Sequence, residues 1–133
     1  PFQIGERRAS RDGWLAPFDQ PESRAMGELT RQVSPRLTLS YHSQGKVIYW
    51  KFMDIEVPGA RRIGEAFADS SGYELEDTPF ASGFAGYKDW FIQEFNRPGY
   101  TVEVGSGENP LPLSQFDEIY RNNLGILVQG LYL

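Results

Sequence analysis

Apolar residues recur every three or four positions in three stretches of the chain, as they do on the buried face of an amphipathic helix. The spacing predicts helices at about residues 21–33, 59–68 and 114–132. The first has Pro at an early helical position after a capping Asp19, and it ends at Ser34-Pro35. A shorter aromatic helix is expected just before the break at Pro98.

Apolar and polar residues alternate in two other segments, which is typical of strands with one buried face, and a third segment is a short run of β-favouring residues. These predicted strands are residues 37–42, 47–50 and 100–104. Residues 73–86 are expected to form a loop, because they are rich in Thr, Pro, Ser, Gly and aromatic residues, and it is long enough to bind a ligand. Helices that alternate with strands in this order predict an α/β domain with a largely parallel sheet.

Composition narrows the class of protein. A chain of 133 residues forms one domain or a piece of one, and its net charge of −5 argues against a nucleic-acid-binding surface. No apolar run approaches the ~20 residues that cross a bilayer. Without cysteine there is neither a disulfide framework nor a thiolate metal site. Residues 1–18 are predicted to be irregular, and because the chain begins at Pro1 without an initiating Met or signal-peptide pattern, we expect a processed or excised end.

Two residues at predicted strand ends carry candidate chemistry. Glu103 lies near the carboxyl end of its strand, where open α/β sheets bind ligands; the alternative is a carboxylate that faces solvent. His42, the one histidine of the chain, either is a satisfied polar residue or binds a metal. The two lie 61 positions apart. We expect them to meet at the carboxyl edge of a sheet covered by the helices near 21–33 and 114–132.

Three motifs, followed by Gly107-Glu-Asn-Pro-Leu-Pro, occur in a characteristic order: Ser40-Tyr-His-Ser-Gln44, Gly86-Tyr-Lys-Asp-Trp90 and Tyr100-Thr-Val-Glu-Val104. Together they resemble the C-terminal part of a zinc metallocarboxypeptidase of the carboxypeptidase A superfamily. More narrowly, the chain is similar to the bacterial γ-D-glutamyl-meso-diaminopimelate peptidases of cell-wall peptides. The resemblance covers residues 19–133. It implies a three-layer α/β domain with a mostly parallel, mixed central sheet, whose first half is not in this chain.

The resemblance assigns His42 to a zinc ligand and Glu103 to the general base, which takes a proton from the attacking water and gives it to the leaving amine. It also implies a cis peptide bond just after the histidine, between Ser43 and Gln44. The family's other ligand pair, His-x-x-Glu, does not occur in these residues, and the resemblance places both this pair and the Asn-Arg pair that grips the substrate carboxylate upstream of Pro1. The zinc site is therefore incomplete, and we expect the chain alone to be inactive.

The resemblance also places four residues beside the substrate. Lys88 falls at the base of the pocket for the terminal side chain, where its ammonium favours a carboxylate such as that of diaminopimelate; the alternative is a lysine that reaches into solvent. Thr101 matches a small residue that lines this pocket, and Ser43 directly follows the zinc ligand. Phe80 stands where the family usually has a mobile Tyr. Neighbouring Tyr87 either supplies the lost hydroxyl or is an aromatic packing residue.

The predicted function is a zinc-dependent peptidase that hydrolyses a peptidoglycan-derived γ-D-Glu-diaminopimelate peptide. The expected partners are that peptide and a second polypeptide that covers the apolar surface exposed where half of the domain is missing. This polypeptide is the N-terminal half itself, another chain, or a second copy of this chain in a homodimer. Neither nucleic acid nor a membrane is expected. The alternative is a truncated or catalytically dead module that binds peptide or peptidoglycan, and an upstream His-x-x-Glu motif would decide between the two. Asp77 and Asp89 are interpreted as caps or solvated charges without chemistry.

Overall fold

The computed structural model describes residues 18, 20–79 and 86–132. The elements in chain order are α1 (Pro21–Val33), β1 (Thr38–His42), β2 (Val47–Tyr49), α2 (Ala60–Ser71), β3 (Glu74–Glu76), α3 (Tyr87–Phe95), β4 (Gly99–Glu103), the 3-10 helix η2 (Leu113–Gln115) and α4 (Phe116–Tyr132). The helices and strands expected from periodicity are confirmed, with ends that shift by a few residues. The predicted cap at Asp19 and residues 1–17 of the predicted irregular segment lie outside the described residues.

Strand β3 was not expected from the sequence. The prediction of a loop over residues 73–86 is wrong here, because β3 pairs in parallel with β2. Glu74 and Glu76 are exposed and flank a single half-buried apolar residue, Leu75. Tyr73 and Leu75 alternate with these two carboxylates, but the alternation covers only four residues, the shortest run that indicates a strand. The backbone joins the sheet because the free edge of β2 offers it a row of unpaired hydrogen-bonding groups.

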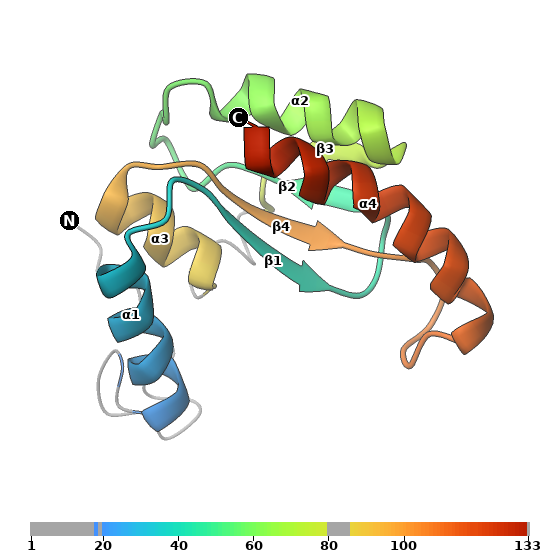
Figure 1. Ribbon diagram of the computed structural model, residues 1–133, viewed down its shortest axis with the longest axis horizontal. Helices are drawn as coiled ribbons and strands as arrows, with labels where there is room; N and C mark the ends of the chain where they lie inside the picture. Colours follow the sequence, from blue (N-terminus) through green and yellow to red (C-terminus); the bar gives the residue numbers. More distant parts are fainter. Residues whose placement is uncertain (1–17, 19, 80–85, 133) are drawn as a thin grey trace.

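The sheet has four strands in the order β1-β4-β2-β3. Strands β1 and β4 are parallel, as are β2 and β3, whereas β2 and β4 are antiparallel. Helices α2 and α4 lie side by side over one face, and α3 contacts β1 and β4 (Figure 1). The predicted α/β fold with a mostly parallel, mixed sheet is therefore confirmed.

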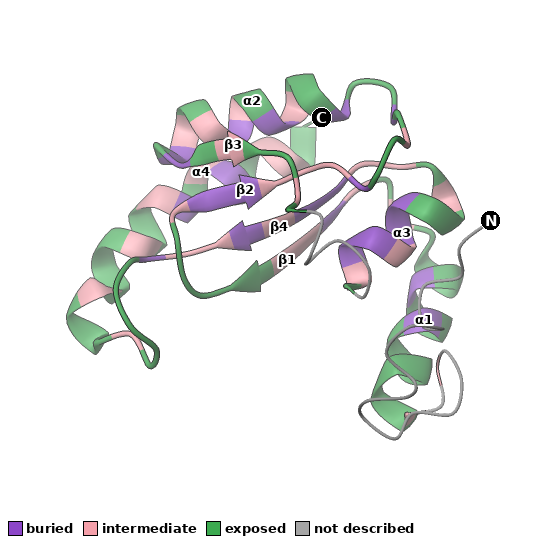
Figure 2. Ribbon diagram, turned by 180° about the vertical axis from the view of Figure 1, so that it is seen from behind, coloured by how far each residue is buried: buried purple, intermediate pink, exposed green. Residues whose placement is uncertain are grey.

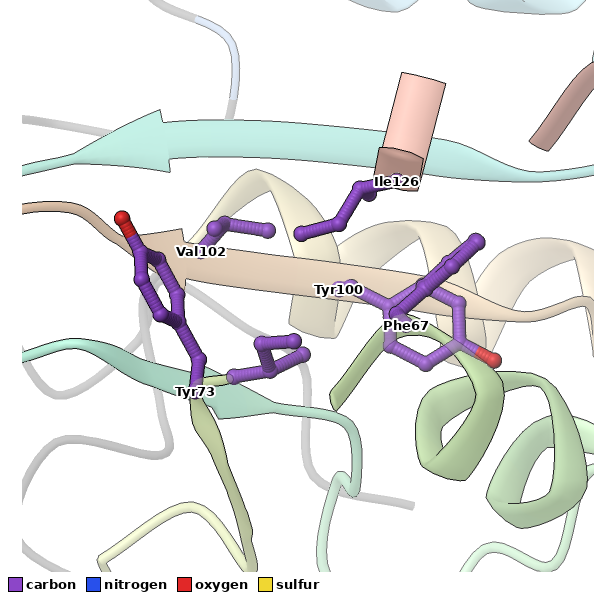
Figure 3. Close-up of a cluster of buried hydrophobic side chains, with 6 residues drawn as sticks. Phe67, Tyr73, Tyr100, Val102 and Ile126 are labelled. Atoms are coloured by element: carbon purple, nitrogen blue, oxygen red, sulfur yellow. The ribbon is translucent and has the colours of Figure 1, made fainter. Parts of the chain in front are cut away.

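The main core lies between the sheet and the layer formed by α2 and α4 (Figure 3). Its buried members are Ile48, Phe67, Tyr73, Tyr100, Val102 and Ile126. The rings of Phe67 and Tyr100 meet edge to face with centroids 5.2 Å apart. The Tyr100 hydroxyl donates to the Ala60 carbonyl at 2.6 Å, and burial raises the pKa of the Tyr100 hydroxyl. Strand β4 is thus fixed from one side by packing, with its buried polar group satisfied.

Helix α1 lies beside α3 and away from the sheet, so the prediction that residues 21–33 cover the sheet is wrong (Figures 1 and 2). A hydrogen bond of 2.7 Å joins the Thr30 hydroxyl to the Tyr87 hydroxyl of α3. The apolar residues that predicted this helix are exposed instead: Met26, Leu29 and Val33. Periodicity identifies the helix, but which element packs against it depends on contacts with residues far along the chain.

Helix α4 also carries a row of exposed apolar side chains. These residues, spaced by three or four positions, are Phe116, Tyr120, Leu124, Leu127 and Leu131. That spacing places them along one face of the helix, beside the face that carries the buried Asn123 and Ile126. Exposed apolar surface of the expected kind is therefore present on both α1 and α4. Among the helices of the described ranges, none is long and apolar enough to span a membrane.

Candidate functional site

His42 and Glu103 end two adjacent parallel strands and are register partners. Side chains alternate along β4, so the buried Tyr100 and Val102 face α2 and α4, while Thr101 and Glu103 face the other side. His42 pairs with Glu103 and shares that side. The prediction that these two residues meet at the carboxyl edge of the sheet is confirmed in its geometry.

The surroundings of Glu103 leave its carboxylate available. Glu103 is half-buried and pairs with Val47 of β2 on its other side, whereas His42 is exposed. Within the described residues, neither the Glu103 nor the His42 side chain has a hydrogen-bond or ion-pair partner. Burial raises the pKa of the nearby Tyr49 hydroxyl, and the carboxylates of Glu76 and Glu103 raise it further. Tyr49 therefore stays a neutral hydrogen-bond donor beside the carboxylate.

The turn after His42 is fastened to the segment that follows Glu103. The Ser43–Gln44 peptide bond is cis, as the resemblance implies. The Ser43 hydroxyl donates to Oδ1 of Asn109 at 2.9 Å, and Nδ2 of Asn109 donates to the Ser43 carbonyl at 3.0 Å. Sequence reasoning missed Asn109, because its contact lies 66 positions away and no local pattern signals it.

Lys88 is buried, with 3 % of its surface exposed, so the interpretation of a lysine that reaches into solvent is wrong. Its ammonium donates to the Lys51 carbonyl at 2.8 Å, to the Thr78 hydroxyl at 3.0 Å and to the carboxylate of Asp89. Burial lowers the pKa of Lys88, and the charge of Asp89 opposes this shift. The interpretation of Asp89 as a cap or a solvated charge is wrong in its second part, because Asp89 is 2 % exposed and paired.

Lys88 lies on the same side of the sheet as Glu103. A side chain at Gly99 would meet the Lys88 side chain at 3.4 Å and the Thr38 hydroxyl at 3.2 Å, which shows how closely α3 approaches the sheet there. Half-buried Thr101 lies between this point and Glu103 along β4. The expected pocket residues Lys88 and Thr101 thus share one side of the sheet with the candidate catalytic pair. Their role toward a substrate stays a prediction.

The two aromatic candidates have separate outcomes. Phe80 lies outside the described residues. The Tyr87 hydroxyl is bonded to Thr30, and its ring lies 5.8 Å from that of Trp90 and 6.3 Å from that of Phe91. Of the two interpretations of Tyr87, the structure supports the packing residue.

The residues of this chain do not fit a complete zinc site. A catalytic zinc takes three protein ligands, and the chain has a single histidine. Across residues 20–79 and 86–132, no group of three His, Cys, Asp or Glu side chains could hold a metal ion. His42 is a suitable donor, but it stands alone.

No family model matches the chain. Over 121 residues, which are 91% of this chain, it is 52% identical to the γ-D-glutamyl-L-diamino acid endopeptidase 1 of Lysinibacillus sphaericus and covers 30% of it. Over 118 residues, 89% of this chain, it is 37% identical to the uncharacterized protein YqgT of Bacillus subtilis (strain 168) and covers 31% of it. The chain thus spans less than a third of the length of these curated relatives.

Two solved structures share the fold. Bovine thrombin-activatable fibrinolysis inhibitor, solved in complex with tick carboxypeptidase inhibitor, matches 87% of this chain with a TM-score of 0.74 at 15% identity. The chain has part of the carboxypeptidase A-like fold. The murein-tripeptide amidase MpaA of Escherichia coli O157 matches 87% of it with a TM-score of 0.64 at 17% identity. The chain covers 46% of the first structure and 44% of the second, so it carries less than half of this carboxypeptidase A-like fold.

The buried pair of Lys88 and Asp89 generates a stability prediction. Asp89→Ala leaves a buried ammonium without its counter-charge, which costs about 3–5 kcal/mol. Asp77→Ala is the matched control, because it breaks the ion pair between Asp77 and Lys51. The Asp77 side chain is 63% exposed, and such a surface pair contributes at most about 1 kcal/mol to the free energy of unfolding. Urea unfolding of both variants measures the two losses. Equal losses would contradict the structural role of the buried pair.

Proposed function

We propose that this chain is part of a zinc-dependent peptidase that hydrolyses a γ-D-Glu-diaminopimelate peptide derived from peptidoglycan, with Glu103 as the general base and His42 as a zinc ligand. The observation that carries the proposal is the register pair His42–Glu103 at the carboxyl edge of the sheet, in a chain 52% identical to a γ-D-glutamyl-L-diamino acid endopeptidase. Likeness in fold to a murein-tripeptide amidase supports the same substrate class.

Each of the two residues has a role that its surroundings suit. The Glu103 carboxylate is half-buried and has no partner among the described residues, so it can accept a proton from the attacking water and return it to the leaving amine. His42 presents an imidazole nitrogen one strand away. Zinc, when bound, would act as a Lewis acid on the scissile carbonyl and on the water.

The site needs residues beyond these 133. We propose that the remaining zinc ligands and the group that grips the substrate carboxylate lie on the N-terminal half of the domain or on another chain, and that the chain alone is inactive. The incomplete ligand set supports this proposal, as does the share of the relatives that the chain covers, 30% and 31%. The exposed apolar rows on α1 and α4 would be covered by the same additional polypeptide, or by a second copy of the chain.

We also propose that Lys88, Thr101, Ser43 and Phe80 lie beside the substrate. The position of Thr101 on the Glu103 side of β4 supports this. The ammonium of Lys88 already forms an ion pair with Asp89, and this limits how Lys88 can bind a substrate carboxylate. Pairing with a substrate carboxylate requires the ammonium to be shared between that carboxylate and Asp89, at a buried site where charge pairing is strong.

A second candidate function is a peptide- or peptidoglycan-binding module without catalysis. The single histidine, together with the lack of a three-ligand group in the described ranges, favours it. The two functions differ in turnover. The full-length protein, incubated with zinc and a γ-D-Glu-diaminopimelate peptide, releases the diaminopimelate product if it is the peptidase and only retains the peptide if it is the module.

The role of Glu103 is tested by Glu103→Gln in the full-length protein. Because a general base contributes on the order of 100- to 10,000-fold, kcat is expected to fall by such a factor while zinc content is unchanged. The matched control is Glu76→Gln, an exposed carboxylate at the end of β3, which β2 separates from β4, and it is expected to leave kcat within about 2-fold. Retention of activity by the Glu103 variant would contradict the proposal.

The role of Lys88 is tested by replacing Lys88 and Asp89 together, because a single replacement would leave the other charge buried and unpaired. The double variant Lys88→Met with Asp89→Asn removes both charges at similar volume. If Lys88 binds the substrate carboxylate, kcat/KM falls selectively on a γ-D-Glu-diaminopimelate peptide, by about 2 kcal/mol or roughly 30-fold, relative to a matched peptide that ends in Lys. Equal losses on both peptides would assign the pair to structure alone.

A further inference from the structure

The segment after Glu103 returns to hold the segment after His42. The Val104 amide donates to the His42 carbonyl at 2.8 Å, and the Gly45 amide donates to the Gly105 carbonyl at 3.0 Å. Farther along, Lys46 and Glu118 form an exposed ion pair at 2.6 Å. The strand pairing of β1 and β4 ends at His42 and Glu103, so beyond that point these contacts determine where the turn lies.

Asn109 makes a two-bond contact within this arrangement. Its Oδ1 accepts from the Ser43 hydroxyl at 2.9 Å, and its Nδ2 donates to the Ser43 carbonyl at 3.0 Å. The two bonds fix the orientation of the carboxamide, because a flipped amide would place its oxygen against the carbonyl oxygen. One side chain therefore holds both the side chain and the backbone of the residue that directly follows His42.

The contact with Asn109 also limits which hydrogen bonds the Ser43 hydroxyl can form with other groups. Its hydroxyl hydrogen is directed at Asn109, so the Ser43 oxygen can only accept a further hydrogen bond. Both Ser43 and Asn109 are exposed, and water competes for each bond. Two bonds from one planar group to one residue restrict the backbone more than two independent contacts would, because they fix an orientation as well as a distance.

We propose that Asn109 is a positioning residue that sets the His42 imidazole against the Glu103 carboxylate. This inference rests on the proposed function, in which those two groups act on one substrate. Its physical basis is that a side chain at a strand end takes its direction from the backbone on both sides. β1 fixes the residue before His42, and Asn109 fixes the residue after it.

The chain offers a matched control in Gln115. The Ser106 amide donates to Oε1 of Gln115 at 3.1 Å, and Nε2 of Gln115 donates to the Ser106 carbonyl at 2.8 Å. This is the same kind of two-bond carboxamide contact in the same segment, but it does not reach the turn after His42. Gln115→Ala thus removes as many hydrogen bonds as Asn109→Ala without releasing Ser43.

The test compares Asn109→Ala, Asn109→Asp and Gln115→Ala in the full-length protein. Hydrogen exchange of the Gly45 amide, followed by mass spectrometry in metal-free protein, is expected to be on the order of 10-fold faster in both Asn109 variants, since Asp lacks the N–H donor. It is expected to stay within about 2-fold in Gln115→Ala. For turnover, kcat is expected to fall about 10- to 100-fold in both Asn109 variants with KM little changed, which is the usual loss when the partners that orient a site residue are removed.

Three outcomes would overturn the inference. Unchanged exchange at Gly45 in Asn109→Ala would show that Asn109 does not hold the turn. Faster exchange with unaltered kcat would show that the turn does not position His42. Equal effects of Gln115→Ala and Asn109→Ala would assign both to general stability. Failure of the proposed function is separate, because it would appear as retained activity in Glu103→Gln, whereas the exchange measurement does not depend on activity.

Discussion

The parallel pairing of β1 with β4 holds the two candidate residues side by side and sets the position of the elements around them. It aligns two strand ends that lie 61 positions apart in sequence, so that His42 and Glu103 become neighbours. Burial of Tyr100 and Val102 against α2 and α4 fixes which residues of β4 face the opposite side. A shift of one residue in that alternation would turn Glu103 into the core, where an unpaired carboxylate is costly. Core packing therefore determines the orientation of the candidate base.

The opposite side of the sheet, where α3 lies, combines polar contacts with a second apolar cluster, in which the buried Ile92 of α3 packs with Phe52, Val57 and Ala60. Buried Lys88, neutralised by Asp89, ties α3 to the Lys51 carbonyl and to Thr78. Asn109 ties the turn after the strand β1 to the segment after β4. Such networks define geometry well when every member is satisfied, which suits a surface that has to present a few groups in fixed positions. The two networks lie on either side of the candidate pair along the strands.

Sequence reasoning succeeds where a signal is local and fails where a contact is distant. Periodicity predicts α4 and places His42 and Glu103 at strand ends, because both signals depend on neighbours in sequence. The general rule that carboxyl ends of parallel strands share one edge then brings the two residues together. Periodicity predicts α1 as a helix, but the element assigned to pack against α1 is wrong. Strand β3 is missed because its alternation covers only four residues and its place in the sheet depends on pairing with β2. The burial of Asp89 and the contact of Asn109 with Ser43 have no local signal at all. The roles of the candidate residues come from resemblance rather than from pattern.

We propose that this chain contributes His42 and Glu103 to one metal-dependent site that another part of the protein completes. The most direct measurement is a crystal structure of the full-length protein with zinc bound. We expect a His42 nitrogen at about 2.0–2.1 Å from the zinc, two further ligands from residues outside this chain, and the Glu103 carboxylate beside the open coordination position without binding the metal. A zinc ion held without His42, or a structure in which Glu103 faces away from the metal, would contradict this proposal.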